Sequence, residues 1–255
     1  MRRIALMVLR NLLICPSWFY HICKYGNHPE KYDANIRYSY LRKVTKRADK
    51  AGRIKVVCDG LENLPKESGY ILFPNHQGLF DALAFLETHE RPFAAVMKKE
   101  VKDIILIKQV IQLLQCLIID REDVKQSMMV IHNMAKEAKA GRNFILFAEG
   151  TRSKRGNYIG EFKPGSFKSA VFAKCPIVPV ALLDSYKVFD TKSLKKVTVQ
   201  IHYLEPLYFE DYKNLKTIEI AAIVEQRITD AIAKAEAERG NEYIITKAEQ
   251  KELNA

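Results

Sequence analysis

Short apolar runs recur along the chain from residue 54 onward, separated by polar residues, glycine or proline. Apolar runs of this length that are bounded by turn-forming residues are typical of buried strands, and apolar–polar alternation is typical of half-buried ones. Both patterns are present, and they predict strands along most of the chain. These strands lie at residues 55–58, 71–73, 93–97, 117–119, 144–147, 177–182 and 196–203.

Between the strands, apolar residues recur at a spacing of three and four, which predicts helices. The clearest helix covers residues 127–140, where Met128, Ile131 and Met134 share one face and Gly141 ends the pattern. Further helices are predicted just after Gly78, in the first part of 104–119, at 163–173 and at 217–239. Alternating strands and helices predict an α/β fold with a mostly parallel sheet flanked by helices, and a site in the loops at the strand ends.

The N-terminal stretch is apolar but interrupted by Arg10, Asn11 and Pro16. A signal peptide needs an unbroken apolar run and a small-residue cleavage site, and a spanning helix needs about 20 apolar residues. Neither pattern is present. An interfacial helix fits better, with Trp18 and Tyr20 at the depth of lipid headgroups. The alternative is a helix that docks on the rest of the protein.

Residues 31–55 hold a second, strongly basic segment with helical periodicity. Its cations are Lys31, Arg37, Arg42, Lys43, Lys46, Arg47, Lys50, Arg53 and Lys55. Near an anionic leaflet, each basic residue adds about 1 kcal/mol of attraction. The alternative is a solvated charged face. We therefore expect an N-terminal two-helix membrane-associating segment at 1–50, a main domain at 51–240 and a polar tail at 241–255.

Composition narrows the class of protein. The chain has 255 residues, of which 48% are hydrophobic and 28% charged, so global disorder is excluded and one large domain is expected. The net charge of +11 favours anionic partners. Nucleic acid is disfavoured because no recognition motif or stacking platform accompanies the charge. The five cysteines are scattered without C-x-x-C spacing, which indicates reduced thiols in a protein that faces the cytoplasm.

His76 stands where a predicted strand gives way to a helix, and Asp81 follows five residues later. In a continuous helix these side chains would point about 140° apart. They meet only if His76 precedes the helix and Asp81 lies in its first turn. A carboxylate on one imidazole nitrogen makes the other a better base. No Ser or Cys lies in this stretch, so the base would act on a substrate hydroxyl. The alternative is a capping His beside an unrelated Asp.

A second group of polar residues follows another predicted strand, at residues 149–152. Gly150 lets the backbone approach a ligand closely, Arg152 offers a planar fork that binds phosphate in two places, and Thr151 adds a hydroxyl. Glu149 would repel phosphate, so we expect it to orient Arg152 or the loop backbone. The alternative is a surface turn with an ordinary salt bridge.

Four ordered blocks span residues 75 to about 180. They are His76 with Asp81, Lys98-Lys99-Glu100 through Ile119-Asp120-Arg121, Glu149 to Arg152, and Pro176 to Val180. Together they resemble the signature of the glycerolipid acyltransferase family, which includes the lysophosphatidic acid acyltransferases. The chain departs from the family between Lys98 and Arg121, where the usual proline and glycine residues are absent. The resemblance therefore leaves acyl-chain length and headgroup open.

The resemblance implies a role for each matching residue. His76 would deprotonate the acceptor hydroxyl and Asp81 would orient it. The loop of Glu149, Gly150, Thr151 and Arg152 would hold the acceptor. Additional phosphate contacts are expected from Lys98 and Arg121. Pro179 would shape the sheet near the thioester.

The expected reaction moves an acyl group from acyl-CoA or acyl carrier protein to lysophosphatidic acid, giving phosphatidic acid. It would use no cofactor, no metal and no acyl-enzyme, at the cytoplasmic face of a membrane to which the protein binds peripherally. Glycerol 3-phosphate or another lysolipid is the alternative acceptor. A non-catalytic protein that binds anionic lipid is the alternative from a different class.

Overall fold

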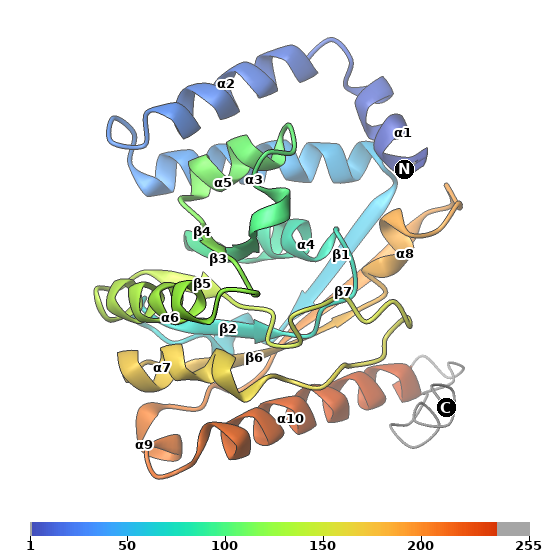
Figure 1. Cartoon of the computed structure of the whole chain (residues 1–255). Helices are drawn as coiled ribbons and strands as arrows, with labels where there is room; N and C mark the ends of the chain where they lie inside the picture. The colour runs from blue at the N-terminus through green and yellow to red at the C-terminus, as the bar shows by residue number, and fades with distance from the viewer. Residues whose placement is uncertain (1, 239–255) are drawn as a thin grey trace.

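A computed structural model describes residues 2–238, and it shows a mixed α/β fold in which one sheet lies between two layers of helices (Figure 1). The strands are β1 (Ile54–Asp59), β2 (Ile71–Pro74), β3 (Phe93–Lys98), β4 (Leu117–Ile119), β5 (Asn143–Ile145), β6 (Ile177–Leu183) and β7 (Val197–Tyr203). All the predicted strands are present.

The seven-stranded sheet has the order β1-β7-β6-β2-β5-β3-β4. Every neighbouring pair is parallel except β6 and β7, so the prediction of a mostly parallel sheet is confirmed. β2 lies near the middle, with β6 on one side and β5 on the other. Because these three strands run in the same direction, the loops that follow them meet at one edge of the sheet.

Helices cover both faces of the sheet. One layer holds α1 (Arg2–Arg10), α2 (Cys15–Asn27), α3 (Ala34–Ala51), α4 (Asp81–Thr88) and α5 (Ile107–Leu114). The other holds α6 (Val124–Lys139), α7 (Lys168–Ala173), α9 (Phe209–Tyr212) and α10 (Thr217–Glu238). The remaining short elements are α8 (Tyr186–Phe189) and the 3-10 turns η1 (Leu61–Asn63), η2 (Lys99–Val101) and η3 (Pro164–Phe167).

β2 separates two apolar clusters because successive side chains of a strand point to opposite faces. Ile71 and Phe73 pack into the cluster that includes residues of α6, α7 and α10, whereas Leu72 packs into the cluster on the side of α3 and α4. All three side chains are fully buried. The strand that leads to His76 is therefore fixed from both sides.

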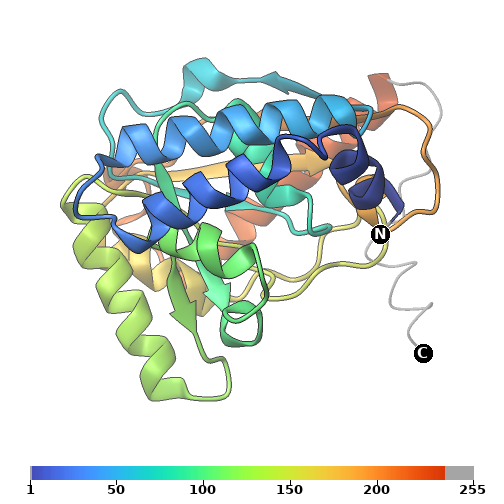
Figure 2. The ribbon, with the colours of Figure 1, turned by 90° about the horizontal axis from the view of Figure 1, so that it is seen from above.

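The N-terminal segment forms three helices where the sequence predicted two. The break falls after Arg10, where the Asn11 side chain donates a hydrogen bond to the carbonyl of Met7. Met7 and Ile22 belong to the same apolar cluster as Leu72, so α1 and α2 pack against the sheet domain. Figure 2 shows α1, α2 and α3 lying over this face. Among residues 2–238 no single helix is long and apolar enough to cross a bilayer; α1 and α2 qualify only as a pair, bent by 99°.

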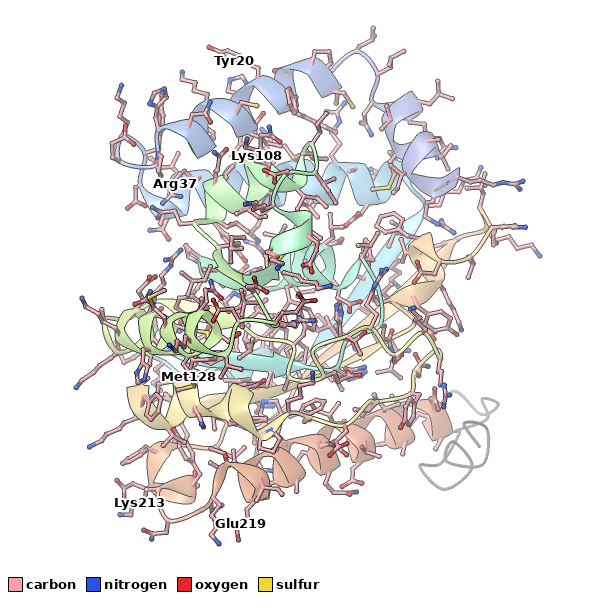
Figure 3. All side chains as sticks on the ribbon, viewed as in Figure 1. Tyr20, Arg37, Lys108, Met128, Lys213 and Glu219 are labelled. Carbon is pink, nitrogen blue, oxygen red and sulfur yellow. The ribbon has the colours of Figure 1, made fainter. Side chains whose placement is uncertain are left out.

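The basic segment is partly structural. Arg37 is 5% exposed and donates to the carbonyls of Leu113 and Tyr32 and to the side chain of Gln115. Figure 3 shows it beside α5, whereas Tyr20 projects outward from α2. Since Arg37 is buried, it contributes neither to a surface that faces an anionic leaflet nor to a solvated charged face.

Several element boundaries differ from the prediction for local reasons. α6 begins before residue 127 because the Asp123 carboxylate caps it and accepts from the amide of Gln126 at 3.0 Å. The helix predicted at 163–173 is the 3-10 turn η3 followed by α7. The predicted end of α10 at Arg239 and the predicted tail at 241–255 lie outside the described residues.

Candidate active site

His76 lies in the turn between β2 and α4, and its ring is hydrogen-bonded to Asp81. Nδ1 of His76 is 2.7 Å from Oδ2 of Asp81. Asp81 is the first residue of α4, so the five-residue spacing does not have to be helical. The structure thus brings these two side chains together in the way that the sequence requires.

The carboxylate of Asp81 is held by several donors besides His76. Oδ2 accepts from the amide of Gln77 at 2.7 Å, and both oxygens lie 3.1 Å from the amide of Gly78. The hydroxyl of Ser185, which follows β6, donates to Oδ1. Asp81 is 1% exposed, so water does not compete for these bonds. Its orientation is fixed by groups from two strand-end loops.

The other nitrogen of His76 remains open. The ring lies against Phe147, with 4.2 Å between ring centroids, and the His76 side chain is 22% exposed. Within residues 2–238, no protein group is hydrogen-bonded to its Nε2. A His that is oriented through Nδ1 and exposed at Nε2 can take a proton from a bound molecule.

Glu149 holds the backbone of the turn that carries His76. Its Oε1 accepts from the amide of His76 at 2.5 Å, and its Oε2 accepts from the amide of Gly160 at 2.8 Å. The amide of Ser153 in turn donates to the carbonyl of His76 at 2.9 Å. Burial raises the pKa of Glu149 to about 7. Of the two orientations expected for Glu149, the structure shows the one toward the backbone.

The predicted cations differ in their surroundings. Arg121 donates to the carbonyl of Gly150 and so reaches the 149–152 loop. Lys98 is exposed and forms an ion pair with Glu100 at 3.0 Å. Arg152 is half-buried, and no carboxylate within residues 2–238 pairs with it. Arg152 is therefore the predicted cation that is most available to an anionic ligand.

Two further side chains tie the turn after β2 to the end of β6 and to Ser185 beyond it, and sequence reasoning missed them. Asn75 exchanges two hydrogen bonds with the backbone of Leu182, at 3.0 and 2.7 Å. Gln77 donates to the same carbonyl at 2.8 Å and accepts from the amide of Ser185 at 2.8 Å. In the sequence, Asn75 and Gln77 are distinguished only by their positions on either side of His76. Ser185 has no sequence signal beyond its position after a predicted strand.

The remaining predictions concern groups outside this cluster. Pro179 lies in β6, buried and in register with Phe73 of β2, and its carbonyl accepts from the amide of Leu204. The hydroxyl-bearing Thr151 is exposed on the loop. Over residues 2–238, no three His, Cys, Asp or Glu side chains are grouped so that they could hold a metal ion.

Comparison with known proteins gives a consistent family. The family described as Acyltransferase matches residues 55–183, which include every predicted site residue. A probable 1-acyl-sn-glycerol-3-phosphate acyltransferase of Mycoplasma genitalium is 32% identical over 178 residues, covering 68% of this chain and 65% of the relative, just under two thirds of its length. A 1-acyl-sn-glycerol-3-phosphate acyltransferase of Escherichia coli is 30% identical over 191 residues, covering 73% and 77%.

The fold also resembles a solved structure. The crystal structure of the 1-acyl-sn-glycerophosphate (LPA) acyltransferase PlsC from Thermotoga maritima superposes with a TM-score of 0.69 at 24% identity. The match covers 93% of this chain and 100% of that chain, so most of this chain shares its fold. From the family match and the relatives together, this chain belongs to the acyltransferase family.

Proposed function

We propose that this protein transfers a fatty acyl group from an acyl thioester to the free hydroxyl of lysophosphatidic acid, giving phosphatidic acid. One observation carries the proposal: His76 is oriented by a buried Asp81, and within residues 2–238 neither its Nε2 nor the nearby Arg152 has a partner. The names of the relatives support the same reaction.

In the proposed step, Nε2 of His76 takes the proton of the acceptor hydroxyl while that oxygen attacks the thioester carbonyl carbon. Asp81 stabilises the imidazolium that forms at the 2.7 Å contact. Collapse of the tetrahedral intermediate breaks the carbon–sulfur bond, and the imidazolium returns the proton to the leaving thiolate. General base catalysis of this kind contributes about 10² to 10⁴ in rate.

The negative oxygen of the intermediate needs hydrogen-bond donors. In the turn after Pro74, the amides of His76, Gln77 and Gly78 already donate to the carboxylates of Glu149 and Asp81. These three amides are therefore not available to the oxyanion. In the part of the chain that the structure describes, the amides of Thr151 and Arg152 have no protein acceptor. We propose the amides of Thr151 and Arg152 as the oxyanion donors.

The acceptor phosphate is proposed to bind at Arg152, whose guanidinium offers two parallel N–H donors. Phosphate binding at Lys98 would require this side chain to exchange its ion pair with Glu100 for the ligand. The acyl donor is acyl-CoA or acyl carrier protein, both of which are acidic and suit the basic surface.

We further propose that the N-terminal helices place the enzyme on the cytoplasmic face of an anionic membrane. Leu12 and Leu13 are 58% and 95% exposed in the turn between α1 and α2. Beside that turn lies an open groove of about 810 Å³. It is lined by Asn11, Ser39, Arg42, Lys43, Lys46, Arg47, Lys50 and Ala51. Apolar tips beside clustered cations are suited to an anionic lipid surface.

The proposal is tested with a panel of acceptors. Purified protein is incubated with acyl-CoA or acyl carrier protein and with lysophosphatidic acid, glycerol 3-phosphate or a zwitterionic lysolipid, and the lipid products are identified by mass spectrometry. We expect phosphatidic acid from lysophosphatidic acid at a kcat/KM at least about 10-fold above the other acceptors. Preferred use of another acceptor would contradict the assigned substrate. Vesicle binding without any product would favour the non-catalytic alternative.

A further inference from the structure

The side chain of Lys163 lies across Gly150 in the 149–152 loop. Gly150 has a φ of +72°, which glycine adopts without strain. A Cβ built at this position would lie 3.2 Å from both Cε and Nζ of Lys163 and 3.4 Å from its Cδ. The absence of a side chain at Gly150 thus lets the lysine chain rest on the loop, with its ammonium group beside the Gly150 backbone.

The base of the Lys163 side chain is fixed by the backbone. The amide of Lys163 donates to the carbonyl of Ala148 at 2.9 Å, and its carbonyl accepts from the amide of Ser166 at 3.0 Å. Pro164 follows and begins η3. The 163 position is therefore tied directly to the segment that carries Glu149, although the side chain itself is exposed.

Positive charge gathers around Gly150, although Glu100 acts electrostatically on Arg121. Arg121 donates to the Gly150 carbonyl, Arg152 lies two residues further on, and Lys163 covers the Gly150 α-carbon. Across residues 2–238, no carboxylate forms an ion pair with any of these three cations. Glu149 directly precedes Gly150, and both of its oxygens accept backbone amides. Asp120 and Glu122 flank Arg121 in the sequence, and Asp120 pairs with Lys99 at 2.7 Å. Neighbouring like charges repel, so an anion that binds among them is stabilised.

We propose that Lys163 binds the phosphate of the acceptor together with Arg152, and that this pair makes the site selective for a phosphate monoester. The identity of the ligand rests on the proposed function. The location of the anion site rests on the cations around Gly150 alone. In this arrangement Arg152 supplies the planar fork and Lys163 supplies a mobile ammonium group. Lys98, which is already paired with Glu100, is a lesser contributor.

The test compares Lys163→Met with the wild-type protein. Methionine keeps an unbranched chain over Gly150 and leaves the backbone bonds in place, but it removes the charge. Lys168→Met is the matched control, since Lys168 begins α7 and belongs to no contact of the site. Lys163→Arg is the conservative variant. Two readouts are used: steady-state acyl transfer, and equilibrium binding of a short-chain lysophosphatidic acid followed by calorimetry.

For Lys163→Met we expect the KM for lysophosphatidic acid to rise about 10-fold, while kcat stays within about threefold of the wild-type value. A rise of this size is expected when substrate binding loses one hydrogen bond to a charged group. The Kd for lysophosphatidic acid should weaken in parallel, while the KM for acyl-CoA stays unchanged. Lys163→Arg and Lys168→Met should retain the wild-type KM within about threefold.

An unchanged KM and Kd in Lys163→Met would overturn the inference. An equal loss with a neutral monoacylglycerol as acceptor would also overturn it, because the effect would then not depend on phosphate. Failure of the proposed function would give a different result from failure of the proposal for Lys163. The wild-type protein would bind lysophosphatidic acid, with weaker binding in Lys163→Met, but would form no phosphatidic acid.

Discussion

At the scale of single residues, a surface His–Asp pair shows what distinguishes His76. His202 is hydrogen-bonded to Asp59 at 2.8 Å through Nδ1, much as His76 is to Asp81. Its other nitrogen, however, lies 3.2 Å from the side chain of Gln200. Asp59 is also exposed, whereas Asp81 is buried. The proposed base His76 therefore differs from His202 in the burial of its partner carboxylate and in an Nε2 that has no hydrogen bond within residues 2–238.

The first prediction follows from this comparison. Asp81→Asn replaces one carboxylate oxygen with an amide donor, so His76 loses its orienting acceptor while the side-chain volume is kept. We expect kcat to fall on the order of 10³-fold, as when a catalytic His adopts the wrong tautomer. Release of free CoA measures the rate, and circular dichroism checks the fold. Asp59→Asn is the control and should retain wild-type activity. Near-wild-type turnover of a folded Asp81→Asn enzyme would contradict the His76–Asp81 assignment.

The second prediction is that replacing Glu149 weakens the loop, because each of its oxygens accepts one backbone amide. In Glu149→Gln one acceptor becomes a donor and faces an N–H group. We expect activity to fall at least about 10-fold and the melting temperature to drop by several degrees, as when a buried polar group loses its partner. Glu161→Gln, at an exposed position nearby, is the control. Equal activity and stability of the two variants would show that the loop is held by other contacts.

Among the helices and strands, the sequence predicts those features that depend on the local pattern of apolar and polar residues. The strands are predictable because each is a short apolar or alternating run, and Pro74 and Asn75 end the β2 run just before His76. The apolar periodicity predicts a start at residue 127, whereas the Asp123 cap makes α6 begin at Val124. The contacts of Ser185 with Asp81 and of Lys163 with Gly150 were not predictable, since they join residues brought together only by the order of the sheet.

The third prediction concerns the interface of α3 with α4. Within residues 2–238, both carboxylate oxygens of Asp49 and Oε2 of Glu87 are buried without a hydrogen-bond partner. Burial, followed by the facing Glu87 carboxyl, raises the pKa of Asp49 to about 9. Arg42 of α3 lies at the same interface, where it donates to the carbonyls of Leu86 and Glu87 and pairs with the exposed Glu90 at 3.8 Å.

The sign of the pH dependence follows from the raised pKa. In the unfolded chain Asp49 ionises near pH 4. Its contribution to stability is therefore complete below that pH and is lost as the pH rises through about 9. We expect Asp49→Asn to melt several degrees higher than the wild type at pH 8, with a difference that vanishes near pH 4. Thermal unfolding at both pH values measures it. A pH-independent difference would contradict a neutral Asp49 in the folded protein.

At the scale of the whole molecule, the N-terminal helices both complete the fold and present an apolar tip. Arg3 is 2% exposed and donates to carbonyls of Gly52, Val188, Ser193 and Lys195. Deleting the first 24 residues would remove this anchor together with the buried Ile22. After such a deletion, a loss of membrane binding could not be distinguished from unfolding. The exposed turn of Leu12 and Leu13 therefore has to be tested by point substitution.

The fourth prediction therefore uses Leu12→Ser with Leu13→Ser, which change exposed side chains only. We expect partitioning onto anionic vesicles to weaken about 10-fold or more, given about 25 cal/mol for each Å² of apolar surface buried. Activity in detergent micelles should remain at the wild-type level. Ile218→Ser, at an exposed site on the opposite helical layer, is the control. Unchanged partitioning of the double variant would contradict membrane contact by this turn and would favour helices that only dock on the domain.

Release of free CoA tests whether His76 is the base of an acyl transfer. The assay supplies acyl-CoA with lysophosphatidic acid and compares the wild type, His76→Ala, and His132→Ala as a control whose exposed ring only stacks on Phe172. We expect turnover in the wild type and in His132→Ala, and a loss of at least about 10²-fold in His76→Ala. Equal CoA release by His76→Ala and the wild type would contradict the assignment of His76 as the base.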